Sequence, residues 1–312
     1  MKKAILIAAA LPALAGGAQA QDSSWAQSAK PFRILDNTYY VGTRGLAAYL
    51  ITTPQGHILL DVGLPQNASV VEQNIAALGF KLSDIKILLI SHAHYDHSGG
   101  VAKLKADTGA QLVVAQGDVY AMEKGVYPGS EQVKAFDFPP AKVDRAIKDG
   151  DTVSLGGVTL TAHITAGHTA GCTTWTWPVK DGAATHTALN FCSASVAANS
   201  LVPPQYPGIV ADYKKTFATA RAIKGDVILG PHARRRSRRA SRARSSTAPP
   251  MSGCWIARRP RSRPTSPVRK PASDHAPDQS HRAHRRPEGG RQGAHPDPRR
   301  GLGRDDPASQ AG

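Results

Sequence analysis

The chain has 312 residues and a formal net charge of +16, but residues 233–312 alone carry +14 and residues 1–232 carry +2. The only large apolar residues of the C-terminal stretch are Met251, Trp255, Ile256, Val268 and Leu302. That stretch cannot bury enough apolar surface to offset the entropy lost on ordering, which excludes a second globular domain and predicts a disordered, basic tail. The residues before it suffice for one compact domain, which we place at 21–232.

The N-terminus has the pattern of a secretory signal. Two lysines precede an apolar run from Ala4 to Leu14, and Ala18-Gln19-Ala20 fits the small-x-small rule for cleavage. We therefore expect residues 1–20 to be a signal peptide and the mature protein, beginning at Gln21, to be periplasmic. The apolar run is too short to span a bilayer, so no stable membrane anchor is expected.

The first half of the domain alternates between strand and helix patterns. Pro54-Gln55-Gly56 marks a turn between two short strands, and Gly109 ends a helix. Ile85–Ile90 is a continuous apolar run broken only by Lys86, which is typical of a strand buried on both faces. The elements expected here are strands at 39–41, 46–52, 57–61, 85–90 and 111–115 and helices at 68–78, 101–108 and 118–124.

The second half repeats this alternation. Gly156-Gly157 is a hairpin turn signal, and residues 209–223 have the spacing of an amphipathic helix. The strands expected here are 152–155, 158–164, 173–177, 187–191 and 226–229. Strands and helices in both halves predict an α/β fold of two sheets packed face to face with helices outside.

Four metal-ligating side chains fall within six residues directly after the buried strand, in Ser91-His92-Ala93-His94-Tyr95-Asp96-His97. His92 and His94 point to the same side of an extended segment and can reach one ion. Asp96 and His97 come after the turn and can face a second ion. Zinc binds imidazole nitrogen and carboxylate oxygen, usually with four ligands, so two ions need further histidines.

The rest of the domain offers those histidines. His168 and His232 each follow an expected strand, in a loop that contains glycine and so permits close backbone approach. His57, His163 and His186 lack metal spacing and are expected to begin a strand, lie on a sheet face and lie in a polar turn, respectively.

The HxHxDH run, the downstream Gly167-His168-Thr169 and the final Gly230-Pro231-His232 resemble the metallo-β-lactamase superfamily, from about Phe32 to His232. The resemblance implies an αββα sandwich with these loops on one edge. It also implies two Zn²⁺ ions. His92, His94 and His168 would hold the first ion, and Asp96, His97 and His232 would hold the second.

Several families of this superfamily, including glyoxalase II, the lactone hydrolases and the tRNA-processing nucleases, have a further aspartate that bridges the two metals. No Asp or Glu occurs from Gly182 to Ala211, where it would be expected. His97 directly after Asp96, and Ser193 where another subclass has a cysteine ligand, are most similar to the third subclass of class B β-lactamases.

That resemblance implies hydrolysis of the β-lactam ring of antibiotics by a metal-bound hydroxide, which Asp96 would orient. Ser193 and Ser195 are candidates for binding the substrate. Asp61 ends a strand near the expected site, so it either supports a metal ligand or caps the turn before Gly63.

Three cysteines are present. Cys172 and Cys192 can pair if their strands adjoin, but buried free thiols are an equally open reading. A shift in register could also bring the thiol of Cys192 near the metal. Cys254 lies in the tail.

Two alternative functions remain. One is another metallo-hydrolase of the same fold, such as a lactonase, a thioesterase or a glyoxalase II-like enzyme. The other is nonspecific nucleic-acid binding through the arginine clusters of the tail. That tail has Trp255 as its one aromatic residue for base stacking, so we expect no specific nucleic-acid partner.

From about Ala233 the composition changes to Arg, Pro, Ala, Ser, Gly and His, as expected when a GC-rich gene is read out of frame. We expect the tail to be such a frameshift product, with a true disordered basic tail as the alternative. Translating the other two frames beyond the His232 codon tests this, because one of them should encode a helix-patterned segment.

Overall fold

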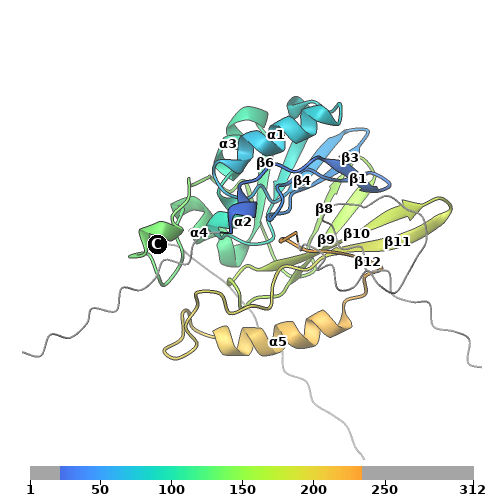
Figure 1. Ribbon diagram of the computed structural model, residues 1–312. Coiled ribbons are helices and arrows are strands. Elements are labelled where there is room, and N and C mark those ends of the chain that lie inside the picture. Colours follow the sequence, from blue (N-terminus) through green and yellow to red (C-terminus); the bar gives the residue numbers. More distant parts are fainter. Residues whose placement is uncertain (1–21, 234–312) are drawn as a thin grey trace, which may run out of the picture. The chain divides into compact units, whose positions relative to one another are not determined.

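The computed structural model describes residues 22–233 as two β-sheets packed face to face, with helices on their outer faces (Figure 1). The first sheet has the strand order β1-β2-β3-β4-β5-β6-β7, and the second has the order β12-β11-β10-β9-β8. The first sheet comprises β1 (Phe32–Leu35), β2 (Thr38–Tyr40), β3 (Tyr49–Thr53), β4 (Gly56–Leu60), β5 (Ile85–Leu89), β6 (Gln111–Ala115) and β7 (Arg145–Ile147). The second comprises β8 (Thr152–Leu155), β9 (Val158–Ile164), β10 (Thr173–Asp181), β11 (Ala184–Asn190) and β12 (Val227–Leu229).

The helices are α1 (Asn67–Ala77), α2 (Tyr95–Ser98), α3 (Val101–Thr108), α4 (Val119–Lys124) and α5 (Ile209–Ala222). Short 3₁₀ turns lie at Ser23–Trp25, Leu82–Asp84, Gln116–Asp118 and Lys134–Phe136. The predicted α/β sandwich is therefore confirmed.

The main core lies between the two sheets. It includes Tyr49, Ile51, Leu60 and Leu89 from the first sheet and Leu160, Trp175, Trp177 and Val179 from the second. Both tryptophans also donate a hydrogen bond to the first-sheet side of the core, Trp175 to the Ile90 carbonyl at 3.0 Å and Trp177 to the Thr38 hydroxyl at 3.1 Å. Burial of each such apolar side chain contributes about 1.5–3 kcal/mol to the free energy of folding, and together these side chains hold the inner faces of the two sheets against each other.

Helices α1 and α3 cover the outer face of the first sheet (Figure 1). Val71 and Ile75 of α1, and Val101 and Leu104 of α3, belong to a second core cluster with Leu50, Leu59 and Leu88 of the sheet. Strand β5 is therefore buried on both faces, as its apolar run predicts, and its end is a rigid base for the residues that follow.

Helix α5 packs on the outer face of the second sheet (Figure 1). The Tyr213 hydroxyl donates to the Ser195 carbonyl, and the Thr216 hydroxyl donates to the Ala166 carbonyl, both at 2.7 Å. These two acceptors lie in the loops after β11 and β9. The helix thus holds two loops at the same edge of the sandwich.

Most elements lie where the sequence pattern predicts. The helix Val101–Thr108 and the strands Gln111–Ala115, Thr152–Leu155 and Val158–Ile164 have the expected bounds, and the first of these ends at Gly109. Gly156 and Gly157 both adopt positive φ, 53° and 86°, as a two-residue hairpin turn between β8 and β9 requires.

Some expectations need correction. The edge strands β1 and β7 have no predicted counterpart, and β10 continues four residues beyond the expected Trp177, through Pro178 to Asp181. Pairing of β9 with β10 stops at Thr176. Pro178, which has no backbone N–H to donate, therefore lies where no hydrogen bond to β9 is required. His186 lies within β11, paired with Val179, and not in a turn.

The predicted signal peptide, residues 1–20, and the tail beyond Ala233 with Cys254 lie outside the described residues. Within residues 22–233, no helix is long and apolar enough to cross a membrane.

Candidate metal centre

The histidine-rich segment lies on the edge of the sandwich where β5 ends. His92 and His94 follow the strand in extended backbone, while Asp96 and His97 lie in the short helix α2. The loop from β9 to β10 brings His168 to the same edge, and the residues after β12 bring His232. All six predicted metal ligands are thereby brought together.

The first group consists of His92, His94 and His168, whose ligand atoms lie within 4.8 Å of one another. All three side chains are buried. Nε2 of His92 and Nε2 of His168 are 3.1 Å apart.

Hydrogen bonds on the far side of two rings determine which nitrogen carries the proton. Nδ1 of His168 is 2.9 Å from the Ser195 carbonyl oxygen, which can only accept, so Nδ1 must donate. The Ser91 hydroxyl donates to the Asp61 carboxylate at 2.7 Å and is left to accept from Nδ1 of His92 at 3.0 Å. Both Nε2 atoms therefore present lone pairs to the same point.

The second group contains Asp96, His97 and His232. Nε2 of His97 lies 3.1 Å from Nε2 of His232 and 3.2 Å from the Asp96 carboxylate, which is itself 3.5 Å from His232. His92 also lies within reach of Asp96 and His97, with the ring centroids of His92 and His97 4.3 Å apart, so its ring adjoins both groups.

These residues fit divalent metal ions. Two lone pairs facing each other at 3.1 Å repel unless a cation lies between them, and two ligands of one tetrahedral zinc lie about 3.3 Å apart. Nε2 of His94 is buried and has no hydrogen-bond partner among the described residues. A buried polar atom without a partner destabilises the fold, and coordination of a metal ion by this nitrogen would remove that cost.

The electrostatics of the two groups differ. Burial, together with repulsion from neighbouring histidines, lowers the pKa of His92 and His94 well below the usual value, and burial also lowers that of His168. Burial opposes charge on His97 as well, but the Asp96 and Asp61 carboxylates outweigh it and raise the pKa of His97 to about 10. Neutral histidine is the form that binds metal.

Asp61 supports this arrangement from behind the ligands. It has a positive φ of 61° and is fully buried, and its carboxylate accepts from the Ser91 amide at 2.6 Å and the Ser91 hydroxyl at 2.7 Å. The same carboxylate lies 3.5 Å from Nδ1 of His97. Asp61 thus contacts His97 of the second group directly and reaches His92 of the first through the Ser91 hydroxyl, which is the geometry expected of a residue that supports metal ligands.

Two residues that sequence analysis missed connect the ligands of the first group. The ring of Tyr127 stacks on His94 with centroids 4.5 Å apart, and its hydroxyl donates to the Asn199 side chain at 2.8 Å. The amide of Asn199 in turn donates to the His168 carbonyl at 2.9 Å. No local pattern marks either residue, because their partners are distant in the sequence.

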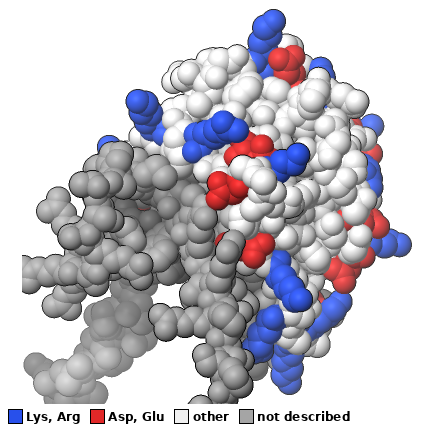
Figure 2. All heavy atoms as spheres, turned by 90° about the vertical axis from the view of Figure 1, so that its right-hand side faces the viewer, with Lys and Arg blue, Asp and Glu red and all other residues white. Residues whose placement is uncertain are grey.

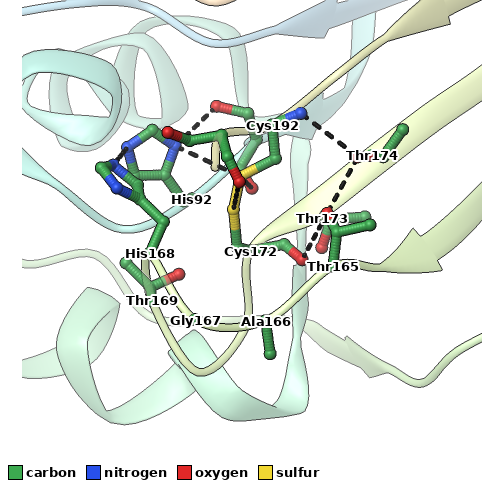
Figure 3. The surroundings of a disulfide bond; sticks show 12 residues. His92, Thr165, Ala166, Gly167, His168, Thr169, Cys172, Thr173, Thr174 and Cys192 are labelled. Carbon is green, nitrogen blue, oxygen red and sulfur yellow. Dashed lines mark hydrogen bonds between the residues drawn. A yellow bond between two sulfur atoms is a disulfide. The ribbon is translucent and has the colours of Figure 1, made fainter. Parts of the chain in front are cut away.

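Cys172 and Cys192 form a disulfide, which joins the start of β10 to the segment after β11 beneath His92 (Figure 3). Of the two readings that the sequence left open, pairing of the cysteines is therefore confirmed and free thiols are wrong, because the two strands adjoin. Sγ of Cys192 lies 3.7 Å from Nδ1 of His92, but a disulfide sulfur is not a thiolate, so the suggested thiol ligand is excluded in this state.

Ser193 and Ser195 lie beside the first group, with their hydroxyls 3.2 Å apart. Ser195 is exposed, and its hydroxyl is 3.3 Å from Nδ1 of His168. The histidines that were not expected to bind metal lie outside both groups. His57 packs against Phe80, and Nε2 of His163 is hydrogen-bonded to the Thr176 hydroxyl at 2.9 Å.

Comparisons with known proteins agree with this site. Residues 41–232 match the family described as the metallo-beta-lactamase superfamily. The chain is 53% identical to BJP-1, a subclass B3 metallo-β-lactamase of Bradyrhizobium japonicum, covering 67% of this chain and 80% of that one with a TM-score of 0.66. It is 41% identical to the FEZ-1 metallo-β-lactamase of Legionella gormanii, covering 66% and 80% with a TM-score of 0.63.

Curated relatives are more distant. A hydroxyacylglutathione hydrolase of Hyphomonas neptunium is 30% identical over 135 residues, which cover 43% of this chain and 44% of that protein. The chain spans about half or less of the length of the curated relatives it matches. The family match extends over more than half of the chain and contains all six residues of the two groups, and the chain therefore belongs to the metallo-β-lactamase superfamily.

Proposed function

We propose that this protein is a di-zinc β-lactamase that opens the β-lactam ring of antibiotics. The observation that carries the proposal is the pair of adjacent ligand groups, built from histidine and one aspartate without a bridging carboxylate. The likeness to BJP-1, named as a subclass B3 metallo-β-lactamase, supports the same reading.

In this proposal His92, His94 and His168 hold one ion, and Asp96, His97 and His232 hold the other. Zinc ions held by these residues would lower the pKa of water at the site and polarise the carbonyl under attack. Asp96 keeps a second carboxylate oxygen with which to accept a hydrogen bond from the attacking water. The hydroxyls of Ser193 and Ser195 lie beside His168 and can donate to the substrate carboxylate.

The curated relatives favour a competing reaction, hydrolysis of a glutathione thioester, because several are named hydroxyacylglutathione hydrolase. The loop Phe191–Ser195 disfavours that reaction, because it contributes no carboxylate where the resemblance places the bridging aspartate. Without this ligand, an ion held by Asp96, His97 and His232 would have fewer anionic partners and could accept a substrate carboxylate.

The test compares substrates on the zinc-loaded protein. We expect hydrolysis of nitrocefin, a penicillin, a cephalosporin or a carbapenem, loss of that activity in EDTA, and recovery on adding zinc. His94→Ala should abolish it, whereas His163→Ala, a histidine outside both groups, should retain it. Turnover of S-lactoylglutathione or a lactone without β-lactam hydrolysis would transfer the assignment to the competing class.

We further propose export to the periplasm, where such an activity confers antibiotic resistance. The disulfide supports an oxidising compartment, since such bonds rarely persist in the cytosol. Retention of residues 1–20 in protein isolated from the periplasmic fraction would contradict the cleavage proposed at Ala20. The nucleic-acid alternative concerns the arginine clusters of the tail, which lie outside the described residues. On the face of the described domain that Figure 2 shows, basic and acidic side chains are interspersed.

A further inference from the structure

Asp118 is a buried carboxylate that the proposed chemistry does not use. It ends the 3₁₀ turn after β6, directly before α4, and is 2% exposed. Among residues 22–233 it has no ion-pair partner of opposite charge within bonding distance. A buried carboxylate without a cation requires hydrogen-bond donors around it.

Its three donors come from the two loops that carry the first ligand group. The Ala93 amide and the Thr169 hydroxyl each donate to Oδ2 at 2.9 Å. The Gly171 amide donates to Oδ1 at 2.8 Å. Ala93 lies between His92 and His94, and Thr169 follows His168, so one carboxylate contacts the neighbours of all three histidines.

The junction is also closely packed. A Cβ on Gly171 would lie 2.6 Å from Cγ of Asp118, and a Cβ on Gly117 would collide with the Ala170 carbonyl. The turn carrying Asp118 and the loop carrying His168 therefore meet with no room for a side chain at either glycine. A shift of either one would move the other.

The bonding pattern requires a carboxylate. Burial raises the pKa of Asp118 to about 6, against the lowering effect of the three hydrogen bonds, so the side chain is ionised at pH 7.5. Both of its oxygens accept. An asparagine has one oxygen, and in either orientation its NH₂ group would face a backbone amide donor, at Ala93 or at Gly171.

We propose that Asp118 is a positioning residue for the first metal ion: it holds the His92–His94 loop and the His168 loop in register. The inference rests on the metal-dependent function proposed above. It predicts that the two histidine loops lose their mutual alignment, and therefore metal affinity, when Asp118 stops accepting from both of them. Groups of this kind typically change metal affinity by about 10–100-fold.

The experiment measures the affinity of the metal-free full-length protein for the first and second zinc equivalents, by competition with a chromophoric chelator at pH 7.5. Asp118→Asn should weaken binding of the first equivalent by about 10–100-fold. The matched control is Asp144→Asn, which makes the same change at a carboxylate that accepts from Leu112 and Lys105, outside the ligand loops. That control should bind both equivalents like the wild type. Near-ultraviolet circular dichroism of each metal-free variant verifies native packing.

A second pair of variants applies if Asp118→Asn does not fold. Thr169→Val removes one donor to Asp118, whereas Thr169→Ser keeps the hydroxyl. The Thr169→Val variant should therefore bind the first zinc equivalent more weakly, and the Thr169→Ser variant should bind it like the wild type. Wild-type affinity in Asp118→Asn or Thr169→Val, or an equal loss in Asp144→Asn, overturns the role of Asp118. A wild-type protein that binds no zinc would instead contradict the proposed function itself.

Discussion

The two ligand groups sit side by side but are built differently. His92, His94 and His168 are each at most 7% exposed, and buried contacts support them from behind. In the second group the His232 side chain is 43% exposed. Its position depends on a backbone bridge to Leu46 and on the ring of Trp25, 5.5 Å away.

The difference shows how one edge of a sandwich provides two sites of unequal rigidity. The first group uses loops from both sheets, which Asp118 and the Tyr127–Asn199 pair connect, while the disulfide joins two segments of the second sheet beneath His92. The second completes its ligand set with a residue close to solvent. A preorganised, buried site loses less entropy on binding, so the first ion should bind more tightly than the second.

Removing a ligand of the first group should have the largest effect. His94→Ala and His168→Ala should each lower zinc affinity of that group by more than about a hundredfold and reduce β-lactam hydrolysis to background. Metal analysis after dialysis, with His163→Ala as control, measures this. Full metal content in either variant would remove the assignment of the first site.

His97→Ala should separate the two sites. Because His97 contacts Asp96 and His232 but is only peripheral to His94 and His168, its loss should weaken the second zinc equivalent about 10–100-fold and the first much less. Stepwise titration of the metal-free variant gives both constants. Equal weakening of both equivalents would show that the groups are not independent.

Protonation should also distinguish the groups. His97 has its pKa raised to about 10 in the metal-free protein, so it is charged at pH 7–8 and must release about one proton when the second ion binds. The first-group histidines have lowered pKa values and are already neutral there. Affinity for the second ion should therefore rise with pH up to about 10, while that for the first stays level. Calorimetry in buffers of different ionisation enthalpy counts the protons, and release on the first ion would contradict this order.

The disulfide supports the first group through stability. It closes a loop with a sequence separation of 20, so replacing both Cys172 and Cys192 with serine should lower the free energy of unfolding by about 3 kcal/mol. Denaturant unfolding measures the loss. Metal content should remain at two equivalents, and loss of one would reinstate Cys192 as a ligand in the reduced protein.

The smallest expected effect concerns Tyr127. Tyr127→Phe keeps the ring stacked on His94 but removes the hydrogen bond to Asn199, which is worth about 1 kcal/mol, or roughly fivefold in affinity for the first ion. Tyr39→Phe is the control, because Tyr39 of β2 packs edge-on against Phe80 and belongs to neither ligand group. Unchanged first-site affinity in Tyr127→Phe would mean that the Asn199 link does not position His168.

Local pattern predicted the parts of this protein that depend on neighbouring residues. The apolar run of β5 followed by four ligands within six residues identified the centre of the site, because a buried strand and its end are encoded in one short segment. The hairpin at Gly156-Gly157 and the helix ending at Gly109 were predicted for the same reason. We assigned His168 and His232 to the same site from the resemblance to a family, because no local pattern connects residues so distant in the sequence.

Tertiary structure decided what depends on contacts between distant segments. The edge strands β1 and β7 pair with one neighbour each and are four and three residues long, too short for an alternating pattern to mark them in the sequence. Pairing of Cys172 with Cys192 required β10 and β11 to adjoin, and Tyr127, Asn199 and Asp118 acquire their roles through partners 25 to 72 residues away. Such roles follow from the packing of one loop on another, because a hydrogen bond depends on distance and direction in space and not on position along the chain.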